Sequence, residues 1–148
     1  MKNLKVYSII ENKLYQRGEF IKYPIDYKLN QLNRLNIRIV VNMIGNFDSE
    51  LNKYINCIHI PIPDNKVMNG ETLILRAKYI SKFINENDCA ALVHCHAGRN
   101  RSALMSALVC MDYLGITGVQ AVELLRIKRP NALANDNFVK FLESKEVL

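Results

Sequence analysis

Residues 90–102 read AALVHCHAGRNRS, and this stretch decides the fold. Ala90 to His94 is a short apolar run that predicts a buried central strand. The segment that begins at Ser102 is almost wholly apolar and predicts a helix in the core. Between them, Cys95 and Arg101 enclose a glycine-containing loop. The sequence therefore predicts a loop that joins the carboxyl end of a strand to the start of a helix.

Strand-like and helix-like patterns alternate on both sides of this loop. The expected strands are residues 5–10, 13–15, 37–44, 55–62 and 90–94, and the expected helices are residues 25–35, 72–85, 102–113, 119–127 and 136–143. This alternation predicts one α/β domain over residues 1–148, with a central, mostly parallel, twisted sheet of about five strands flanked by helices. Ligands of such sheets bind beyond the carboxyl ends of the strands.

Composition sets limits on the class of protein. The chain has 148 residues, of which 49% are hydrophobic, and no apolar run approaches membrane-spanning length. We therefore expect a cytoplasmic domain without stable membrane insertion. The net charge of +6 favours an anionic partner, although a solvated basic face explains it equally well. The four cysteines are irregularly spaced and predict buried thiols, not a disulfide framework.

The loop from Cys95 to Arg101 has the features of a phosphate site. Its backbone N–H groups can converge on one anion, and the following helix adds its positive end. Arg101 can bind two phosphoryl oxygens with its planar guanidinium. The same donors would stabilise a thiolate at Cys95, which can attack phosphorus, while Ser102 can hydrogen-bond the departing sulfur. The residues expected to bind phosphate are His96, Ala97, Gly98, Arg99, Asn100 and Arg101.

The leaving group of a phosphate ester needs a proton, so a carboxylic acid should approach this loop from another segment. Asp64 is the best candidate, because it follows the strand that ends in Pro61 and Pro63 and begins a polar loop. The alternative is that Asp64 merely begins a turn after proline.

A metal site is another reading of the same residues. Cys57 and His59 could face His94, Cys95 and His96 across paired strands and bind zinc. That reading leaves Arg101 without a task, so we expect no metal and no cofactor, with His94 as a supporting residue that orients the loop.

With these residues in place, the sequence resembles the dual-specificity branch of the cysteine-based protein tyrosine phosphatase superfamily over nearly its whole length. The family's His-Cys-x5-Arg-Ser/Thr pattern is matched by HCHAGRNRS at residues 94–102, and Asp64 matches the acid about 30 residues upstream. Weaker similarities lie at residues 13–18, 40–43 and 135–138. The resemblance implies that Cys95 is the nucleophile, Arg101 binds phosphate, Asp64 acts as acid and then base, Ser102 assists hydrolysis, and Asn42 supports the loop.

The resemblance also bears on the substrate. No tryptophan precedes Asp64, so the mobile acid loop of the tyrosine-specific enzymes is missing and a shallow cleft is implied. We expect phosphorylated proteins, with phosphotyrosine first and phosphoserine or phosphothreonine second. The basic residues His96 and Arg99 resemble lipid-directed members, so phospholipids or RNA 5′ phosphates are the alternative, and a phosphate-binding pseudophosphatase is the non-enzymatic one. Arg129 is a candidate for substrate contact, or else an exposed cation at a helix end.

Overall fold

Strand β5 (Ala90–His94) lies at the centre of the sheet in the computed structural model, which describes residues 2–148. The strands follow the order β1-β2-β5-β3-β4. The others are β1 (Tyr7–Ile10), β2 (Leu14–Arg17), β3 (Ile37–Asn42) and β4 (Asn56–His59). β1 runs antiparallel to β2, and all other neighbouring strands are parallel. The predicted α/β domain with a mostly parallel five-stranded sheet is confirmed.

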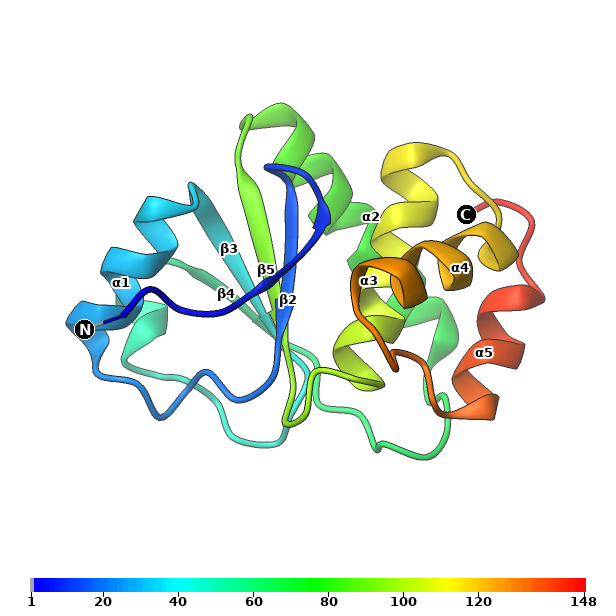
Figure 1. The fold of residues 1–148 in the computed structure, drawn as a ribbon, viewed down its shortest axis with the longest axis horizontal. Coiled ribbons are helices and arrows are strands. Elements are labelled where there is room, and N and C mark those ends of the chain that lie inside the picture. The colour runs from blue at the N-terminus through cyan, green and yellow to red at the C-terminus, as the bar shows by residue number, and fades with distance from the viewer. Residues whose placement is uncertain (1) are drawn as a thin grey trace.

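Helices cover both faces of the sheet (Figure 1). They are α1 (Ile25–Arg34), α2 (Gly70–Glu86), α3 (Arg101–Leu114), α4 (Gly118–Lys128) and α5 (Asp136–Glu143), with a short 3-10 turn at Leu51–Lys53. α1 packs on one face, and the other four helices gather on the opposite face. Among residues 2–148 no single helix is long and apolar enough to span a bilayer; α3 and α4 reach that length and apolarity only as a pair bent by 119°.

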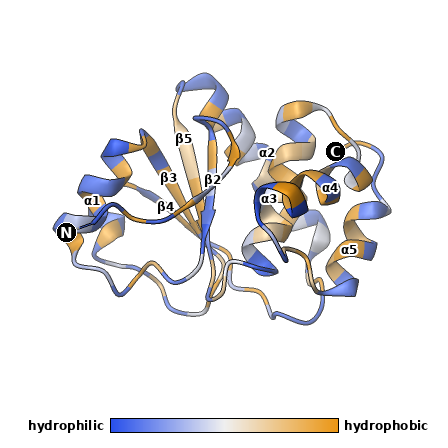
Figure 2. Cartoon of the chain, in the orientation of Figure 1, coloured by the Kyte–Doolittle hydropathy of each residue, from blue (hydrophilic) through white to orange (hydrophobic). Residues whose placement is uncertain are grey.

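The alternation of side chains along the central strands builds two apolar clusters. Val40 and Leu92 face α1, where they pack with Phe20 and Leu32. The opposite face of the same strands, including Val93, belongs to the larger cluster that contains α2 and α3. α3 is buried along most of its length, as its apolar sequence predicted. Figure 2 shows the hydrophobic tones of β3 and β5 enclosed by helices with bluer outer faces.

Two strands end earlier than their apolar sequences predicted, for different reasons. β3 stops at Asn42, because its side chain accepts a hydrogen bond from the N–H of Ile44 and donates one to the carbonyl of Asn46. These bonds turn the chain away from the sheet. β4 stops at His59, just before Pro61, which has no N–H to donate to a sheet ladder.

Candidate active site

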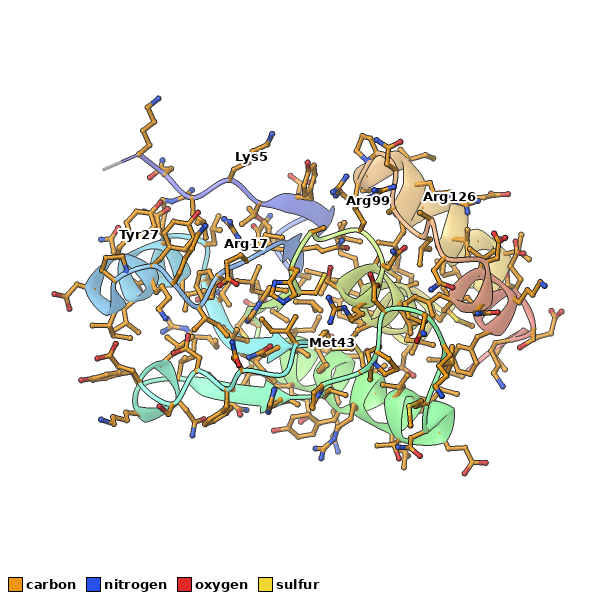
Figure 3. All side chains as sticks on the ribbon, turned by 90° about the horizontal axis from the view of Figure 1, so that it is seen from below. Lys5, Arg17, Tyr27, Met43, Arg99 and Arg126 are labelled. Atoms are coloured by element: carbon orange, nitrogen blue, oxygen red, sulfur yellow. The ribbon has the colours of Figure 1, made fainter. Side chains whose placement is uncertain are left out.

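The carboxyl ends of the four parallel strands meet at one edge of the sheet, the lower edge in Figure 1. β5 leads there into residues 95–101, which we call the cysteine loop, and β4 leads into residues 60–69, which we call the Asp64 loop. The connection from β2 to α1 arrives at the same edge. Figure 3 looks onto this edge and shows the labelled Arg17 and Arg99, with Arg126 of α4 (Gly118–Lys128) further along. The topology therefore gathers the residues predicted from separate parts of the sequence.

Cys95 lies at the base of the cysteine loop and is almost fully buried. Its Sγ lies 3.2 Å from the Oγ of Ser102 and accepts a hydrogen bond from the N–H of Gly98 over 3.3 Å. Ser102 is itself buried in the first turn of α3. The sulfur therefore has two groups beside it that can donate to a thiolate.

Four consecutive carbonyl groups of the cysteine loop are bound from outside the loop. The carbonyl of His96 accepts from the N–H of Glu19 (2.9 Å), and that of Arg99 accepts from the N–H of Leu133 (2.7 Å). The carbonyl of Gly98 accepts from Gln16 Nε2 (2.6 Å) and Arg129 Nε (3.0 Å). Arg129 Nη2 also donates to the fourth carbonyl, that of residue 97, over 3.2 Å.

This arrangement fixes the direction of the loop's N–H groups. In a trans peptide unit the N–H points opposite to the carbonyl that precedes it. Because the carbonyls of residues 96–99 point outward, the N–H groups of residues 97–100 point inward. Converging N–H groups of this kind form an anion-binding concavity. The bond from the N–H of Gly98 to Cys95 Sγ agrees with that direction.

Arg101 and Asp64 close the site above the thiol. The Nε of Arg101 lies 3.7 Å from Oδ1 of Asp64, which is too long for a hydrogen bond. That buried nitrogen has no hydrogen-bond partner within the described part of the chain. The pocket between these groups measures about 130 Å³, smaller than the several hundred Å³ of most small-molecule sites. It is lined by Asp64, Cys95, His96, Ala97, Arg99, Asn100 and Arg101.

Larger hollows exist elsewhere, but they lack such chemistry. One of about 340 Å³ lies at the opposite edge of the sheet, around Lys13 and Asp88. These two residues form an exposed ion pair of 2.7 Å, which raises the pKa of Lys13 and lowers that of Asp88 through their hydrogen bond. Size alone therefore does not identify the site.

His94 is fully buried immediately before Cys95, with its ring centroid 5.6 Å from that of Phe20. Burial lowers its pKa to about 4, so the ring is neutral at pH 7. Neither ring nitrogen has a hydrogen-bond partner within residues 2–148. Within residues 2–148 no hydrogen bond from the His94 ring therefore orients the cysteine loop, and the ring packs against Phe20 instead.

Two other sequence-predicted roles change with the geometry. Arg129 does not project freely toward a substrate, because its guanidinium donates to the carbonyls of residues 97 and 98 and lies 4.7 Å from the ring of Tyr7. It is a support of the cysteine loop. The side-chain hydrogen bonds of Asn42 go to the turn after β3, as described above, so Asn42 contributes to the cysteine loop at most through its neighbours.

The zinc reading fails on topology. β3 separates β4 from β5, so Cys57 and His59 do not face His94 and Cys95 across paired strands. Within residues 2–148, no three His, Cys, Asp or Glu side chains are grouped so that they could hold a metal ion.

Several supports of the cysteine loop were missed in the sequence. Gln16 is fully buried in β2, and a polar residue inside a buried strand is the signal that could have drawn attention to it. Gly18 approaches the carbonyl of His96 so closely that a Cβ would lie 2.5 Å from that oxygen. Leu133 has a positive φ of 58°, a strained conformation that nothing in its sequence context announces.

The fold and the site define a class of protein in which a loop with converging N–H groups joins a central strand to a helix. Residues 20–147 match the family model described as dual specificity phosphatase, catalytic domain. The chain therefore belongs to this family.

The curated relatives are longer proteins. The chain is 31% identical over 114 residues to dual specificity protein phosphatase 9 of Homo sapiens. The aligned residues cover 75% of this chain and 29% of that protein. It is 28% identical over 136 residues to dual specificity protein phosphatase PHS1 of Arabidopsis thaliana, covering 91% and 14% respectively. The crystal structure of Cydia pomonella PTP-2 phosphatase superposes with a TM-score of 0.78 over 96% of both chains at 21% identity, which shows the shared fold.

Proposed function

We propose that this chain is a phosphatase that hydrolyses phosphate monoesters on proteins through a phosphocysteine intermediate on Cys95. One arrangement carries the proposal: the thiol of Cys95 and the guanidinium of Arg101 open onto one small pocket, and Asp64 lies at its mouth. The family match supports the same chemistry. Phosphotyrosine is the first expected substrate, followed by phosphoserine and phosphothreonine.

The first half of the reaction transfers the phosphoryl group to sulfur. The thiolate of Cys95 attacks phosphorus, so an S–P bond forms while the ester P–O bond breaks. The inward N–H groups and Arg101 bind the three non-bridging oxygens and stabilise their negative charge in the transition state. Asp64 gives its proton to the departing oxygen.

The second half regenerates the enzyme. Asp64, now a carboxylate, takes a proton from a water molecule that attacks phosphorus. The S–P bond breaks and inorganic phosphate forms. The hydroxyl of Ser102, which lies 3.2 Å from Sγ, hydrogen-bonds the departing thiolate. This half accounts for a serine buried directly beneath the loop.

The family match favours phosphorylated proteins over the alternatives from the sequence, phospholipids and RNA 5′ phosphates. The residues that motivated those alternatives, His96 and Arg99, are exposed at the rim of the pocket, where they can contact groups that flank a phosphoresidue. A cytoplasmic location stays a prediction; it agrees with four free cysteines, since a reactive thiol requires reducing surroundings.

Hydrolysis of 4-nitrophenyl phosphate and of a phosphotyrosine peptide tests the proposal, with wild type, Cys95→Ser and the control Cys57→Ser assayed in chelator with and without vanadate. We expect wild type and Cys57→Ser to be equally active, insensitive to chelator and inhibited by vanadate, and Cys95→Ser to be inactive. Full activity in Cys95→Ser, or activity lost in chelator and restored by zinc, would contradict the mechanism. A pseudophosphatase would bind vanadate but turn over neither substrate.

A further inference from the structure

Asp64 has little side-chain support of its own. Its side chain is 54% exposed, and its nearest cation, the Nε of Arg101, is 3.7 Å away. The Asp64 loop contains neither helix nor strand. An exposed carboxyl on such a loop can transfer a proton productively only if the backbone beneath it is fixed, because the donor must come within about 3 Å of the leaving oxygen. The question is which groups fix that backbone.

At Asp64 itself the first turn of α5 supplies them, whereas the start of the loop is held by backbone hydrogen bonds from Ile60 and Ile62 to the chain at the end of β3. Asn135 Nδ2 donates to the carbonyl of Asp64 over 2.7 Å, and Asn137 Nδ2 donates to the carbonyl of Asn65 over 2.7 Å. Two asparagines, spaced by two residues at one helix end, thus hold two consecutive carbonyls of the Asp64 loop. Both bonds connect segments about 70 residues apart in the sequence.

Asn135 also connects the Asp64 loop to the cysteine loop. Its backbone N–H donates to Oδ1 of Asn100 over 3.1 Å, and Asn100 directly precedes Arg101. Its own Oδ1 accepts from the N–H groups of Asn137 and Phe138 and caps α5. Phe138 is fully buried, so the helix end is anchored in the core. One residue therefore sets the position of the acid relative to the phosphate-binding loop.

α5 also contacts the far end of the Asp64 loop. Gly70 is the first residue of α2, immediately after the loop, and a Cβ there would lie 2.7 Å from Cε1 of Phe141. α5 thus fits closely against the point where the loop ends. Both the carbonyl of Asp64 and the end of its loop are held by the same helix.

We propose that Asn135 and Asn137 are positioning residues that hold Asp64 in place for proton transfer by binding the backbone of its loop. The inference rests on the proposed role of Asp64 as general acid. Asparagine suits position 135 because its oxygen caps the helix while its NH₂ group binds the loop. Serine would keep the first function and lose the second, without adding charge.

The test compares two leaving groups. Phenyl phosphate releases phenol, whose pKa of about 10 matches that of tyrosine, and its hydrolysis needs the acid. 4-Nitrophenyl phosphate releases a far more stable anion and needs the acid much less. We would measure kcat/KM for both substrates with wild type, Asp64→Asn, Asn135→Ser, Asn137→Ala, the pair Asp64→Asn/Asn135→Ser, and the control Asn85→Ser, an exposed asparagine near the end of α2.

We expect Asp64→Asn to lose about 100-fold or more on phenyl phosphate and far less on 4-nitrophenyl phosphate. Asn135→Ser and Asn137→Ala should show the same preference with smaller losses, roughly 10-fold on phenyl phosphate and less on 4-nitrophenyl phosphate. Misplacement weakens proton transfer without removing the acid. In the Asp64→Asn background, Asn135→Ser should add nothing further on phenyl phosphate. Asn85→Ser should behave as wild type.

Equal losses on both substrates, or no loss, in Asn135→Ser and Asn137→Ala would overturn the positioning role while leaving Asp64 as the acid. No leaving-group selectivity in Asp64→Asn would instead overturn the role of Asp64, and the positioning role with it. Thermal unfolding checks that each variant is folded. If Asn135→Ser does not fold, Asn137→Ala decides, because that side chain is exposed and does not cap the helix.

Discussion

The cysteine loop and the Asp64 loop meet at one pocket but are held by different kinds of contact. Donors from β2, the segment after it, Arg129 and Leu133 bind the cysteine loop at each carbonyl from His96 to Arg99. Near Asp64 the other loop is held at two carbonyls by the side chains of Asn135, which is half-buried, and Asn137, which is exposed. The contacts of the cysteine loop keep its N–H groups pointing toward one place, where an anion can bind. The contacts of the Asp64 loop leave its carboxyl exposed, so that it can exchange protons. Substitutions should therefore affect the two loops differently.

Among substitutions that leave the nucleophile in place, the largest effect should come from Gly98→Ala in the cysteine loop. Gly98 has a φ of +70°, and a Cβ there would lie 2.9 Å from both the carbonyl carbon of Arg17 and the nitrogen of Gly18. Because these are backbone atoms, the loop must move and its N–H groups must lose their convergence. We expect kcat/KM for 4-nitrophenyl phosphate to fall by about 10³-fold, the size of losing an oxyanion donor, with weaker vanadate binding.

Gly45→Ala is the matched control, since a Cβ at Gly45 meets nothing within 4 Å. It should keep wild-type activity and vanadate affinity. If Gly98→Ala had near-normal kinetics, the cysteine loop would tolerate substitution as well as the Asp64 loop does.

His94, immediately before the cysteine loop, should make the free energy of unfolding depend on pH. Burial depresses the pKa of His94 to about 4, whereas in the unfolded chain it is 6.5. As pH falls below 6.5 the unfolded chain binds the proton first, so stability present above pH 6.5 is lost progressively toward pH 4. The contribution of His94 to this loss is about 3 kcal/mol.

Urea unfolding at pH 7, 5.5 and 4.5 measures this dependence in wild type and in His94→Gln. The variant should lose less stability on acidification, whatever its stability at pH 7. Equal slopes in the two proteins would mean that His94 does not titrate as a buried group.

Removing the guanidinium of Arg129 should cause an intermediate loss of activity, because it binds the cysteine loop. In Arg129→Met the carbonyls of residues 97 and 98 lose charged donors. Bonds to charged groups contribute about 1.5–3 kcal/mol, so we expect kcat/KM to fall by about 10- to 100-fold on good and poor leaving groups alike. Added guanidinium ion should restore part of the activity.

The control is Lys128→Met, which removes the exposed cation next to Arg129. It should remain close to wild type. If Arg129→Met instead lost activity only on large phosphopeptides, Arg129 would be a substrate contact after all.

The smallest changes should come from the other three cysteines. Burial raises the pKa of the Cys57 and Cys110 thiols to about 12 and also raises that of Cys89. Iodoacetamide at pH 7 should therefore label Cys95 first, and vanadate should protect it. Peptide mass mapping checks both outcomes; labelling of Cys57 or Cys89 before Cys95 would contradict this order.

A disulfide between Cys95 and Cys57 or Cys89 would protect the nucleophile from further oxidation, but the fold keeps these cysteines too far apart to form one. Cys89 lies before β5 and Cys95 lies after it, about 20 Å apart at about 3.3 Å per residue. Cys57 lies on β4, two strands from β5, a lateral separation of about 9.5 Å. Both separations exceed the Cα distance of about 7 Å that a disulfide can bridge.

The sequence predicted the parts of the molecule that depend on local pattern. The strand before Cys95, the helix after it and the loop between them follow from apolar runs and one glycine turn, and Asp64 follows from its place after β4. Gln16, Arg129 and Asn135 were not predicted to hold the two loops, because their partners lie far away in the sequence. A polar residue that holds a distant carbonyl has the same local pattern as one that faces water, and only the fold distinguishes them.

The most direct test of the central claim is to trap the intermediate. A phosphotyrosine peptide would be mixed with wild type and with Asp64→Asn, quenched in acid within milliseconds to seconds, and the digested protein examined by mass spectrometry. We predict one added phosphoryl group on the peptide that contains Cys95 in wild type, and the same site of phosphorylation in Asp64→Asn, because the variant keeps the nucleophile. Turnover without any phosphorylated Cys95 peptide, or with the phosphoryl group on another residue, would contradict the account.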